Sequence, residues 1–214
     1  MRPGGPGQGI AEKMELKRLR RRDERKCRAF ARTGMHFDWY TESRFLQNLY
    51  ARYFWYLEMN GATKVLAAYE DGKLTGVLLA RFEGEKRVRH SFFRTCFVKG
   101  VSFFMHVFYH GGAGSYDAVN RKFLEEYRKE YTPDGEIRFL AADPDRIGEG
   151  TGTYLLNALR IEEKDRETYL FTDSSCTYQF YDKRGFERFR EEEIVMDFGK
   201  KQVNLLCFLY RIVL

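Results

Sequence analysis

The chain carries, over residues 143–156, the stretch Asp143-Pro-Asp-Arg-Ile-Gly-Glu-Gly-Thr-Gly-Thr-Tyr-Leu-Leu156. The run before it, Glu136-Ile-Arg-Phe-Leu-Ala-Ala142, is short and apolar and predicts a buried strand. The run after it spaces Leu155, Leu156 and Leu159 as on one face of a helix. Three alternate glycines therefore lie at a strand-to-helix junction. Without Cβ atoms they let backbone N–H groups approach an anion, and the helix adds the positive end of its dipole.

Two other glycine motifs do not fit this stretch. A P-loop needs Gly-Lys-Ser/Thr where the helix begins, and the chain has Gly152-Thr-Tyr there. A dinucleotide-binding turn needs Gly-x-Gly-x-x-Gly, whereas the third glycine here follows the second after one residue. A tight helix entry that binds no ligand remains an alternative for the glycines taken alone.

A second motif follows about twenty-five residues further on. Thr168-Tyr-Leu-Phe-Thr172 predicts another strand, and Phe180-Tyr181 with Gly185-Phe186 follows it. Taken together, the two motifs resemble those of the GNAT superfamily of acyl-CoA-dependent N-acetyltransferases. The resemblance extends from about residue 135 to residue 198.

Two positions depart from the pattern of that superfamily. Ile147 takes the place of its usual Arg, with Arg146 one position earlier, and Ser174 takes the place of its usual Asn. Because backbone N–H groups provide most of such a phosphate site, the first change weakens the expected cofactor binding without removing it.

The resemblance implies an α/β (α+β) fold, with a mixed central sheet of about seven strands flanked by helices. We expect a disordered extension over residues 1–13 and a single acyltransferase domain over 14–214, with Met14 as an alternative start. About fifty residues separate Phe82 from Glu136, so we expect a helical insertion over about 84–132 between the third and fourth strands. Its aromatic residues either line the acceptor pocket or pack the extra helices. The other expected elements are strands at 15–19, 65–69, 74–82, 191–198 and 203–210, and helices at 23–31, at 116–131 and after an N-cap at Thr41.

Composition narrows the class of protein. The chain has 214 residues, enough for one sizeable core, and its apolar and charged fractions are typical of a soluble globular protein. Its four cysteines are scattered, which favours reduced thiols and a cytoplasmic location. The net charge of +6 comes largely from residues 13–28, where a solvated helix face is a better interpretation than a nucleic-acid arm. The most apolar stretch, 91–109, contains Arg94, Lys99 and His106 and is too polar to span a membrane.

The resemblance implies acetyl-CoA as cosubstrate and no metal. Main-chain groups of the fourth strand would meet the pantetheine and the thioester, and the loop would hold the pyrophosphate. Polar side chains near the loop and after the next strand would add further contacts. The whole expected cofactor site consists of Leu140, Ala141, Ala142, Ile147, Gly148, Glu149, Gly150, Thr151, Gly152, Thr153, Ser174 and Tyr178.

The same resemblance assigns the catalytic residues. Tyr181 would be the general acid that protonates the departing thiolate, with Tyr178 as an alternative. Glu136, which opens the fourth strand, would be the general base, with Asp143, Asp173 or a chain of waters as alternatives.

The function that we expect is transfer of an acetyl group to the amine of a small molecule or amino-acid-like acceptor, by direct attack on the thioester. The alternatives are a non-catalytic acyl-CoA-binding sensor and a basic nucleic-acid-binding module. Membrane binding is not expected, and the sequence allows a monomer or a homodimer. It leaves open the acceptor and the length of the acyl group.

Overall fold

The computed structural model describes residues 13–39, 41–89, 91–108, 113–197 and 202–214. Helices and strands alternate along the chain in the expected order, with two helices between the third and fourth strands. The elements are β1 (Glu15–Lys17), η1 (Arg21–Asp23), α2 (Glu24–Gly34), α3 (Arg44–Gly61), β2 (Lys64–Glu70), β3 (Lys73–Phe82), α4 (Phe92–Phe108), α5 (Ala113–Glu130), β4 (Gly135–Ala142), η2 (Pro144–Arg146), α6 (Thr151–Glu162), β5 (Glu167–Asp173), α7 (Gln179–Asp182), β6 (Glu187–Asp197) and β7 (Gln202–Val213).

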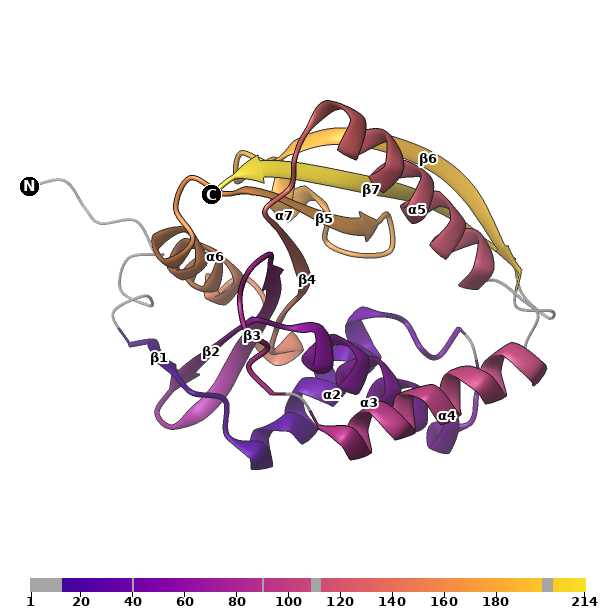
Figure 1. Cartoon of the computed structure of the whole chain (residues 1–214). Helices are drawn as coiled ribbons and strands as arrows, with labels where there is room; N and C mark the ends of the chain where they lie inside the picture. Colours follow the sequence, from indigo (N-terminus) through magenta and orange to yellow (C-terminus); the bar gives the residue numbers. More distant parts are fainter. Residues whose placement is uncertain (1–12, 40, 90, 109–112, 198–201) are drawn as a thin grey trace, which may run out of the picture.

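The strands form one seven-stranded sheet in the order β1-β2-β3-β4-β5-β7-β6. All neighbouring pairs are antiparallel except β4 and β5, which are parallel. This confirms the expected mixed sheet of seven strands flanked by helices. The parallel pair is also where the N-terminal half of the sheet meets the C-terminal half (Figure 1).

Helices cover both faces of this sheet (Figure 1). On one face, α6 packs Leu155, Leu156 and Leu159 into a cluster that also contains side chains from β3 and β7. On the other face, α2 and α3 cover the N-terminal half through Phe30 and Trp55. The helix α5 covers the C-terminal half of that same face, where Val119, Phe123 and Tyr127 pack against β5 and β7.

The two inserted helices lie on different halves of the molecule. The helix α4 runs beside α3, while α5 lies over β6 and β7 (Figure 1). Several aromatic side chains of α4 are exposed, Phe92 at 71%, Phe93 at 84% and Phe103 at 70%, so they do not pack the inserted helices together. The insertion therefore contributes one helix to each half of the sheet.

Two local predictions were wrong. The helix α3 begins at Arg44, and its N-cap is Ser43, whose Oγ accepts a hydrogen bond from the Leu46 N–H at 3.5 Å. Thr41 instead accepts from the Ser43 N–H at 3.1 Å, so its hydroxyl shapes the turn before the helix.

The first strand is also shorter than expected, ending at Lys17 because Arg21 already opens a 3-10 turn. The expected N-terminal extension lies outside the described residues except for Lys13. Over the part of the chain that the structure describes, no helix combines the length and apolarity needed to cross a membrane.

Candidate active site

The parallel strands β4 and β5 are paired over only two residue positions. Gly135 lies opposite Thr168 and Glu136 opposite Tyr169, and the ladder between these strands extends no further. Beyond that point β4 continues to Ala142 and β5 to Asp173. We call the part of the sheet where the two strands run on without this pairing, 137–142 and 170–173, the seam. A strand beyond its ladder presents N–H and C=O groups that an extended ligand can pair with.

The direction of the β4 backbone groups follows from its other neighbour. The Asp143 N–H donates to the Thr75 carbonyl at the end of β3, at 2.8 Å. Because backbone groups of successive strand residues point to opposite sides, Leu140 and Ala142 direct theirs toward the seam and Ala141 toward β3. Of the three β4 residues expected to contact the cofactor, two thus have main-chain groups placed to meet a ligand in the seam.

A loop with left-handed glycines follows β4. Gly148 has φ +90° and Gly150 has φ +80°, a conformation that other residues adopt with strain. A Cβ built on either glycine would meet no atom within 4 Å, so open space lies beside both. Gly150 is the N-cap of the twelve-residue helix α6, whose first N–H groups point into this space. The loop therefore has the form of an anion cradle.

The other glycine and the two threonines of the motif have different surroundings. Gly152 faces the Phe180 ring, which a Cβ would approach to 3.0 Å, so this glycine serves packing. Thr151 is buried, with its methyl group against Gly76 of β3. The Thr153 hydroxyl faces the Arg184 guanidinium and accepts from its Nε at 2.9 Å.

Arg184 was not among the residues that the sequence indicated. Its guanidinium lies 3.8 Å from the centre of the Phe180 ring, and burial followed by the nearby Arg160 lowers its pKa. Through its contact with Thr153, it places a cation beside the first turn of α6. A basic residue directly before Gly-Phe was the available signal in the sequence.

The charges on the loop itself are paired with one another. Arg146 contacts the carboxylates of Glu149 and Glu70, so its charge is already paired. Ile147, at the position of the superfamily's Arg, is 84% exposed and offers no charge. Asp143, an alternative base, is buried and held by Lys26 at 2.5 Å and by the Asp145 N–H at 3.2 Å. Its carboxylate thus orders the start of the loop.

Tyr181 lies in an aromatic cluster on the α6 face. Its ring contacts those of Phe180 and Phe186 at 5.2 and 5.3 Å between centroids. Burial is the main cause that raises its pKa, so the phenol remains protonated and able to donate. The side chains of Tyr181 and Leu140 border the same core cluster, which brings the acid candidate to the α6 side of the seam.

Tyr178, the alternative acid, borders that cluster as well. It stacks on Phe208 at 4.8 Å, and the Arg188 guanidinium lies near both rings, 5.2 Å from the Tyr178 centroid and 5.0 Å from that of Phe208. These ring contacts give Tyr178 a structural role in the core.

Glu136 lies on the opposite face of the sheet. Its neighbour Ile137 belongs to the cluster under α6, so Glu136 points to the face that α3 and α5 cover. The carboxylate accepts from Arg138 Nη1 at 3.0 Å. The acid and base candidates therefore approach the seam from opposite faces.

Arg138 connects Glu136 to a second carboxylate. It sits where the β3–β4 register shifts, between Leu79 and Ala80 on the partner strand, and its Nε donates to Glu58 Oε2 at 2.7 Å. Glu58 projects from α3 and is 8% exposed; burial raises its pKa to about 7, against the opposing effect of Arg138. We call these three residues the Glu136–Arg138–Glu58 triad.

The sequence analysis missed Arg138 and Glu58. A charged residue inside an otherwise apolar strand was the signal for Arg138. Glu58, between Trp55 and Met59 on the buried side of α3, was the corresponding signal in the helix.

The remaining predicted residues, Asp173 and Ser174, lie at the end of β5. Ser174 bonds Leu206 of β7 in both directions, at 2.9 Å through its N–H and at 3.0 Å through its hydroxyl. Asp173 is buried and accepts from the Ser175 N–H at 2.8 Å. The hydroxyl of Ser174 therefore secures the sheet where the superfamily's Asn would be.

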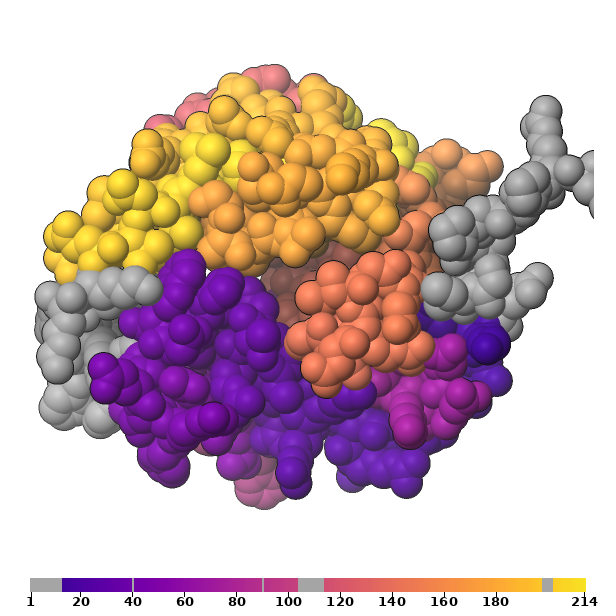
Figure 2. Space-filling model, turned by 180° about the vertical axis from the view of Figure 1, so that it is seen from behind, coloured from indigo at the N-terminus to yellow at the C-terminus, as the bar shows by residue number. Residues whose placement is uncertain are grey.

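The surface between these elements is hollowed. Figure 2 shows a hollow between the salmon loop before α6, the violet N-terminal helical part and the orange and yellow C-terminal part. All four cysteines are free thiols, and burial raises the pKa of Cys176, near this region, to about 11. Within the described ranges there is no group of three or more His, Cys, Asp or Glu residues arranged to hold a metal ion.

Comparison with known proteins shows which solved structures have a similar fold. No family model matches the sequence, and no curated protein matches it. The structure is similar to an N-acetyltransferase from Staphylococcus aureus, with a TM-score of 0.52 and 13% identity over 92% of this chain and 100% of that one. It is also similar to a mutant agmatine N-acetyltransferase in its apo form, with a TM-score of 0.57 and 9% identity over 94% and 100% of the two chains.

A third similar structure is described as a histone acetyltransferase and related acetyltransferase from Corynebacterium glutamicum, with a TM-score of 0.52 and 15% identity over 92% and 95% of the two chains. At these identities the similarity concerns the fold. The chain has the fold of the GNAT N-acetyltransferases, as its two motifs predicted.

Proposed function

We propose that this protein is an N-acetyltransferase that moves an acetyl group from acetyl-CoA to the amine of a small-molecule or amino-acid-like acceptor. The observation that carries the proposal is the combination of an open strand edge with an anion cradle at its end. Leu140 and Ala142 direct main-chain groups into the seam, and the β4 strand leads directly into the left-handed glycines before α6. An elongated ligand with amides at one end and phosphates at the other fits this order of groups.

The residues of the cradle fit a pyrophosphate in three respects. Gly148 and Gly150 have open space beside them, the α6 N-terminus contributes free N–H groups, and Arg184 adds a nearby cation. The Glu149 carboxylate opposes an anion, but Arg146 already neutralises it. The main-chain groups of Leu140 and Ala142 would hold the amides, and the side chain of Thr153 would support the phosphates through Arg184.

The chain's own groups account for the proton transfers. Acetyl-CoA supplies the activated thioester carbonyl, so no protein nucleophile is needed. Glu136 would take the proton that the attacking ammonium must lose, directly or through water, as the C–N bond forms. Tyr181 would give its phenolic proton to the sulfur as the C–S bond breaks, and a main-chain N–H in the seam would stabilise the carbonyl oxygen.

Two alternatives remain testable beside this proposal. A non-catalytic acyl-CoA sensor would bind the ligand and release no thiol with any amine. A nucleic-acid-binding module would depend on residues 13–28, but several of those side chains have partners within the fold. Lys26 binds Asp143 and the Leu74 carbonyl, and Arg20 donates to the Gly72 carbonyl.

The deciding experiment is a thermal-shift titration with acetyl-CoA and CoA, followed by a thiol-release assay over a panel of amines. A ligand that binds only the folded state raises Tm in proportion to the logarithm of its concentration. We expect a shift that grows with concentration for both ligands, and thiol release with at least one amine. No shift at millimolar ligand would contradict cofactor binding, and a shift without thiol release would favour the sensor.

A further inference from the structure

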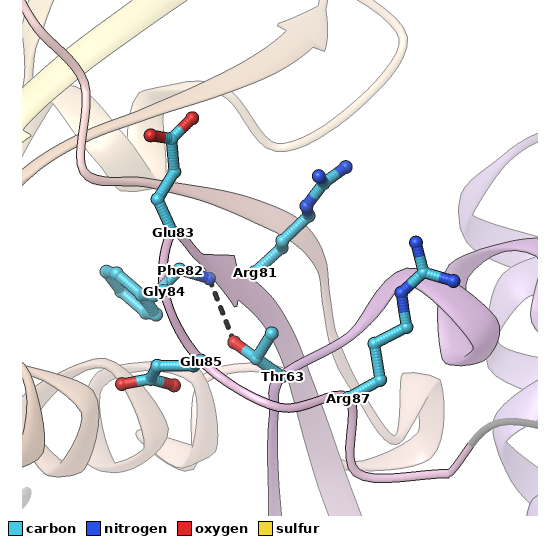
Figure 3. Close-up of a pocket in the computed structure, with 7 residues that line it drawn as sticks. All are labelled: Thr63, Arg81, Phe82, Glu83, Gly84, Glu85 and Arg87. Carbon is cyan, nitrogen blue, oxygen red and sulfur yellow. Dashed lines mark hydrogen bonds between the residues drawn. The ribbon is translucent and has the colours of Figure 1, made fainter.

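Two adjoining hollows lie at the start of β4, on the rim of the sheet. The larger, of about 390 Å³, is lined mainly by the end of β3 and the loop after it, with Thr63, Arg81, Glu83, Glu85 and Arg87 (Figure 3). The smaller, of about 70 Å³, is lined by Arg81 and Glu83 as well, together with Arg128, Glu136 and Tyr169. Arg81 and Glu83 thus belong to both hollows.

Three arginines of these hollows lack hydrogen-bond and ion-pair partners among the residues that the structure describes. No hydrogen bond or ion pair joins Arg81, Arg87 or Arg128 to any residue within the described ranges. Figure 3 shows the side chains of Arg81 and Arg87 extending to the same side of the loop. Their guanidinium groups are therefore available to a ligand.

The glutamates that line the hollows differ from the arginines in that most of them have cationic partners. Glu85 is engaged by Lys64 at 3.8 Å and by Arg166 at 3.5 Å, and Glu136 by Arg138 at 3.0 Å. Glu83 alone among the acidic residues lining the two hollows has no cationic partner in the part of the chain that the structure describes. The two linings together hold three arginines and three glutamates, and two of these glutamates already have cationic partners. Among the described residues, the unpaired charges of the lining are therefore three guanidinium groups and one carboxylate.

These charges lie directly beside the base candidate. Arg81 and Glu136 are opposite one another in the β3–β4 register, and Glu136 is opposite Tyr169 in the β4–β5 register. Side chains of directly opposed residues have Cβ atoms about 4.5–5.5 Å apart. An amine held at Glu136 would thus have any substituent on its β3 side within reach of Arg81.

The loop that carries Arg87 is attached to the fold. Its Val88 N–H donates to the Ala62 carbonyl at 3.0 Å, and the Thr63 hydroxyl accepts from the Phe82 N–H at 2.9 Å. These hydrogen bonds hold the wall of the larger hollow without using the side chains of Arg81 or Arg87.

We propose that Arg81, Arg87 and Arg128 form an anion-binding subsite for the acceptor, whose substrate class is an amine that carries a carboxylate or phosphate group close to the reacting nitrogen. Guanidinium groups bind both anions through paired N–H donors. The unpaired Glu83 carboxylate opposes a second anionic group, so an amino-acid-sized zwitterion matches the lining better than a polyanion. This inference rests on the proposed acetyltransferase function and names its acceptor class.

The test compares three amines of similar size in the thiol-release assay: ethanolamine, β-alanine and O-phosphoethanolamine. We expect one or both anionic amines to have a kcat/KM at least about tenfold above that of ethanolamine. Arg81→Gln and Arg128→Gln should each raise the KM for the preferred amine about 10- to 100-fold, the usual range for a lost charge-assisted hydrogen bond. The matched control is Arg25→Gln, an exposed arginine of α2, which should change neither constant.

A second measurement separates failure of the subsite from failure of the proposed function. N-acetyl-β-alanine and N-acetylethanolamine are titrated into the CoA-saturated wild type and Arg81→Gln protein, with binding followed by NMR. Stronger binding of the carboxylate compound that Arg81→Gln abolishes supports the subsite, even if no amine is turned over. Equal kcat/KM for the three amines overturns the inference while leaving an acetyltransferase, and equal binding of the two acetylated compounds overturns it where no amine reacts.

Discussion

At the residue scale, two left-handed glycines allow the effect of backbone conformation on stability to be separated from its effect on ligand binding. Gly150 has φ +80° and open space beside it, and Gly72 has φ +73° and equally open space in the β2–β3 turn. The two glycines therefore share the same backbone requirement, and only Gly150 lies in the cradle. If the same substitution is made at both glycines, any difference in ligand binding between the two variants reports on the cradle.

We expect Gly150→Asp and Gly72→Asp to lower the free energy of unfolding by a similar amount, about 1–2 kcal/mol, because each places a side chain in the left-handed region. Only Gly150→Asp should also abolish the Tm shift produced by acetyl-CoA, since it adds a side chain and a negative charge at the cradle. Urea unfolding and the thermal-shift titration measure the two effects. A normal acetyl-CoA shift in the Gly150 variant would remove this loop from the cofactor site.

Tyr181 carries a prediction about chemistry alone. Tyr181→Phe removes only the hydroxyl group and leaves the ring contacts with Phe180 and Phe186 in place. Turnover should fall about tenfold to a thousandfold, in line with loss of a general acid, while the dissociation constant of acetyl-CoA changes less than about twofold. Tyr56→Phe is the control, since Tyr56 lies on α3 and its hydroxyl accepts from Arg52. Equal turnover in both variants would exclude Tyr181 as the acid.

At the scale of elements, the Glu136–Arg138–Glu58 triad joins α3 to β4 through a buried carboxyl. Burial raises the folded-state pKa of Glu58 to about 7, above its unfolded value near 4.5. Between these two pH values the folded protein binds the proton and the unfolded chain does not. Stability from this group is therefore lost as pH rises from about 4.5 to about 7 and is constant above that.

Wild type should thus lose stability relative to Glu58→Gln between pH 5 and pH 8, by about 1–3 kcal/mol at 1.4 kcal/mol per unit of pKa shift. Urea unfolding of both proteins at pH 5, 6, 7 and 8 measures the difference. If wild type instead gains stability relative to the variant as pH rises, the ion pair with Arg138 outweighs burial and the carboxylate is charged in the folded state.

A second contact between elements depends on a glycine. The first residue of β4, Gly135, is packed against β3 so closely that a Cβ would lie 2.3 Å from Phe82 Cδ1 and 2.9 Å from the Arg81 carbonyl oxygen. Gly135→Ala should reduce stability by about 1–3 kcal/mol through overpacking. Gly34→Ala, at the end of α2 with no atom near its Cβ position, should be neutral or slightly stabilising. Urea unfolding of the two variants decides, and equal stabilities would show that β3 can move away from β4.

At the scale of the whole molecule, the halves of the sheet meet at the short β4–β5 ladder. The helix α6 covers the N-terminal half and also reaches β7 through the shared core cluster. On the other face, the His36 side chain reaches the Ser175 carbonyl at 3.3 Å, which joins the segment after α2 to the one after β5. The two halves of the sheet are thus joined by backbone pairing at the start of the seam, and by side-chain contacts on both faces of the sheet.

We expect the Leu140 and Ala142 amides to exchange with solvent faster than that of Phe139 and to become protected when acetyl-CoA is added, because a ligand in the seam would accept their hydrogen bonds. Amide hydrogen exchange followed by NMR, with and without the ligand, measures this. Protection confined to the loop at 147–152 would place the ligand outside the seam.

The sequence by itself determined the order of helices and strands, the insertion and the glycine loop, because each depends on local periodicity, on chain length or on backbone freedom at single residues. The mixed sheet was expected from the resemblance of the two motifs to a known superfamily. It placed the N-cap of α3 two residues early, because Thr41 and Ser43 offer the same hydroxyl chemistry and packing selects between them. Only the tertiary structure decided the extent of the seam, the partnership of Glu58 with Arg138 and the position of Arg81 beside Glu136. These depend on the register between segments far apart in the chain, which is set by the packing of both faces of the sheet.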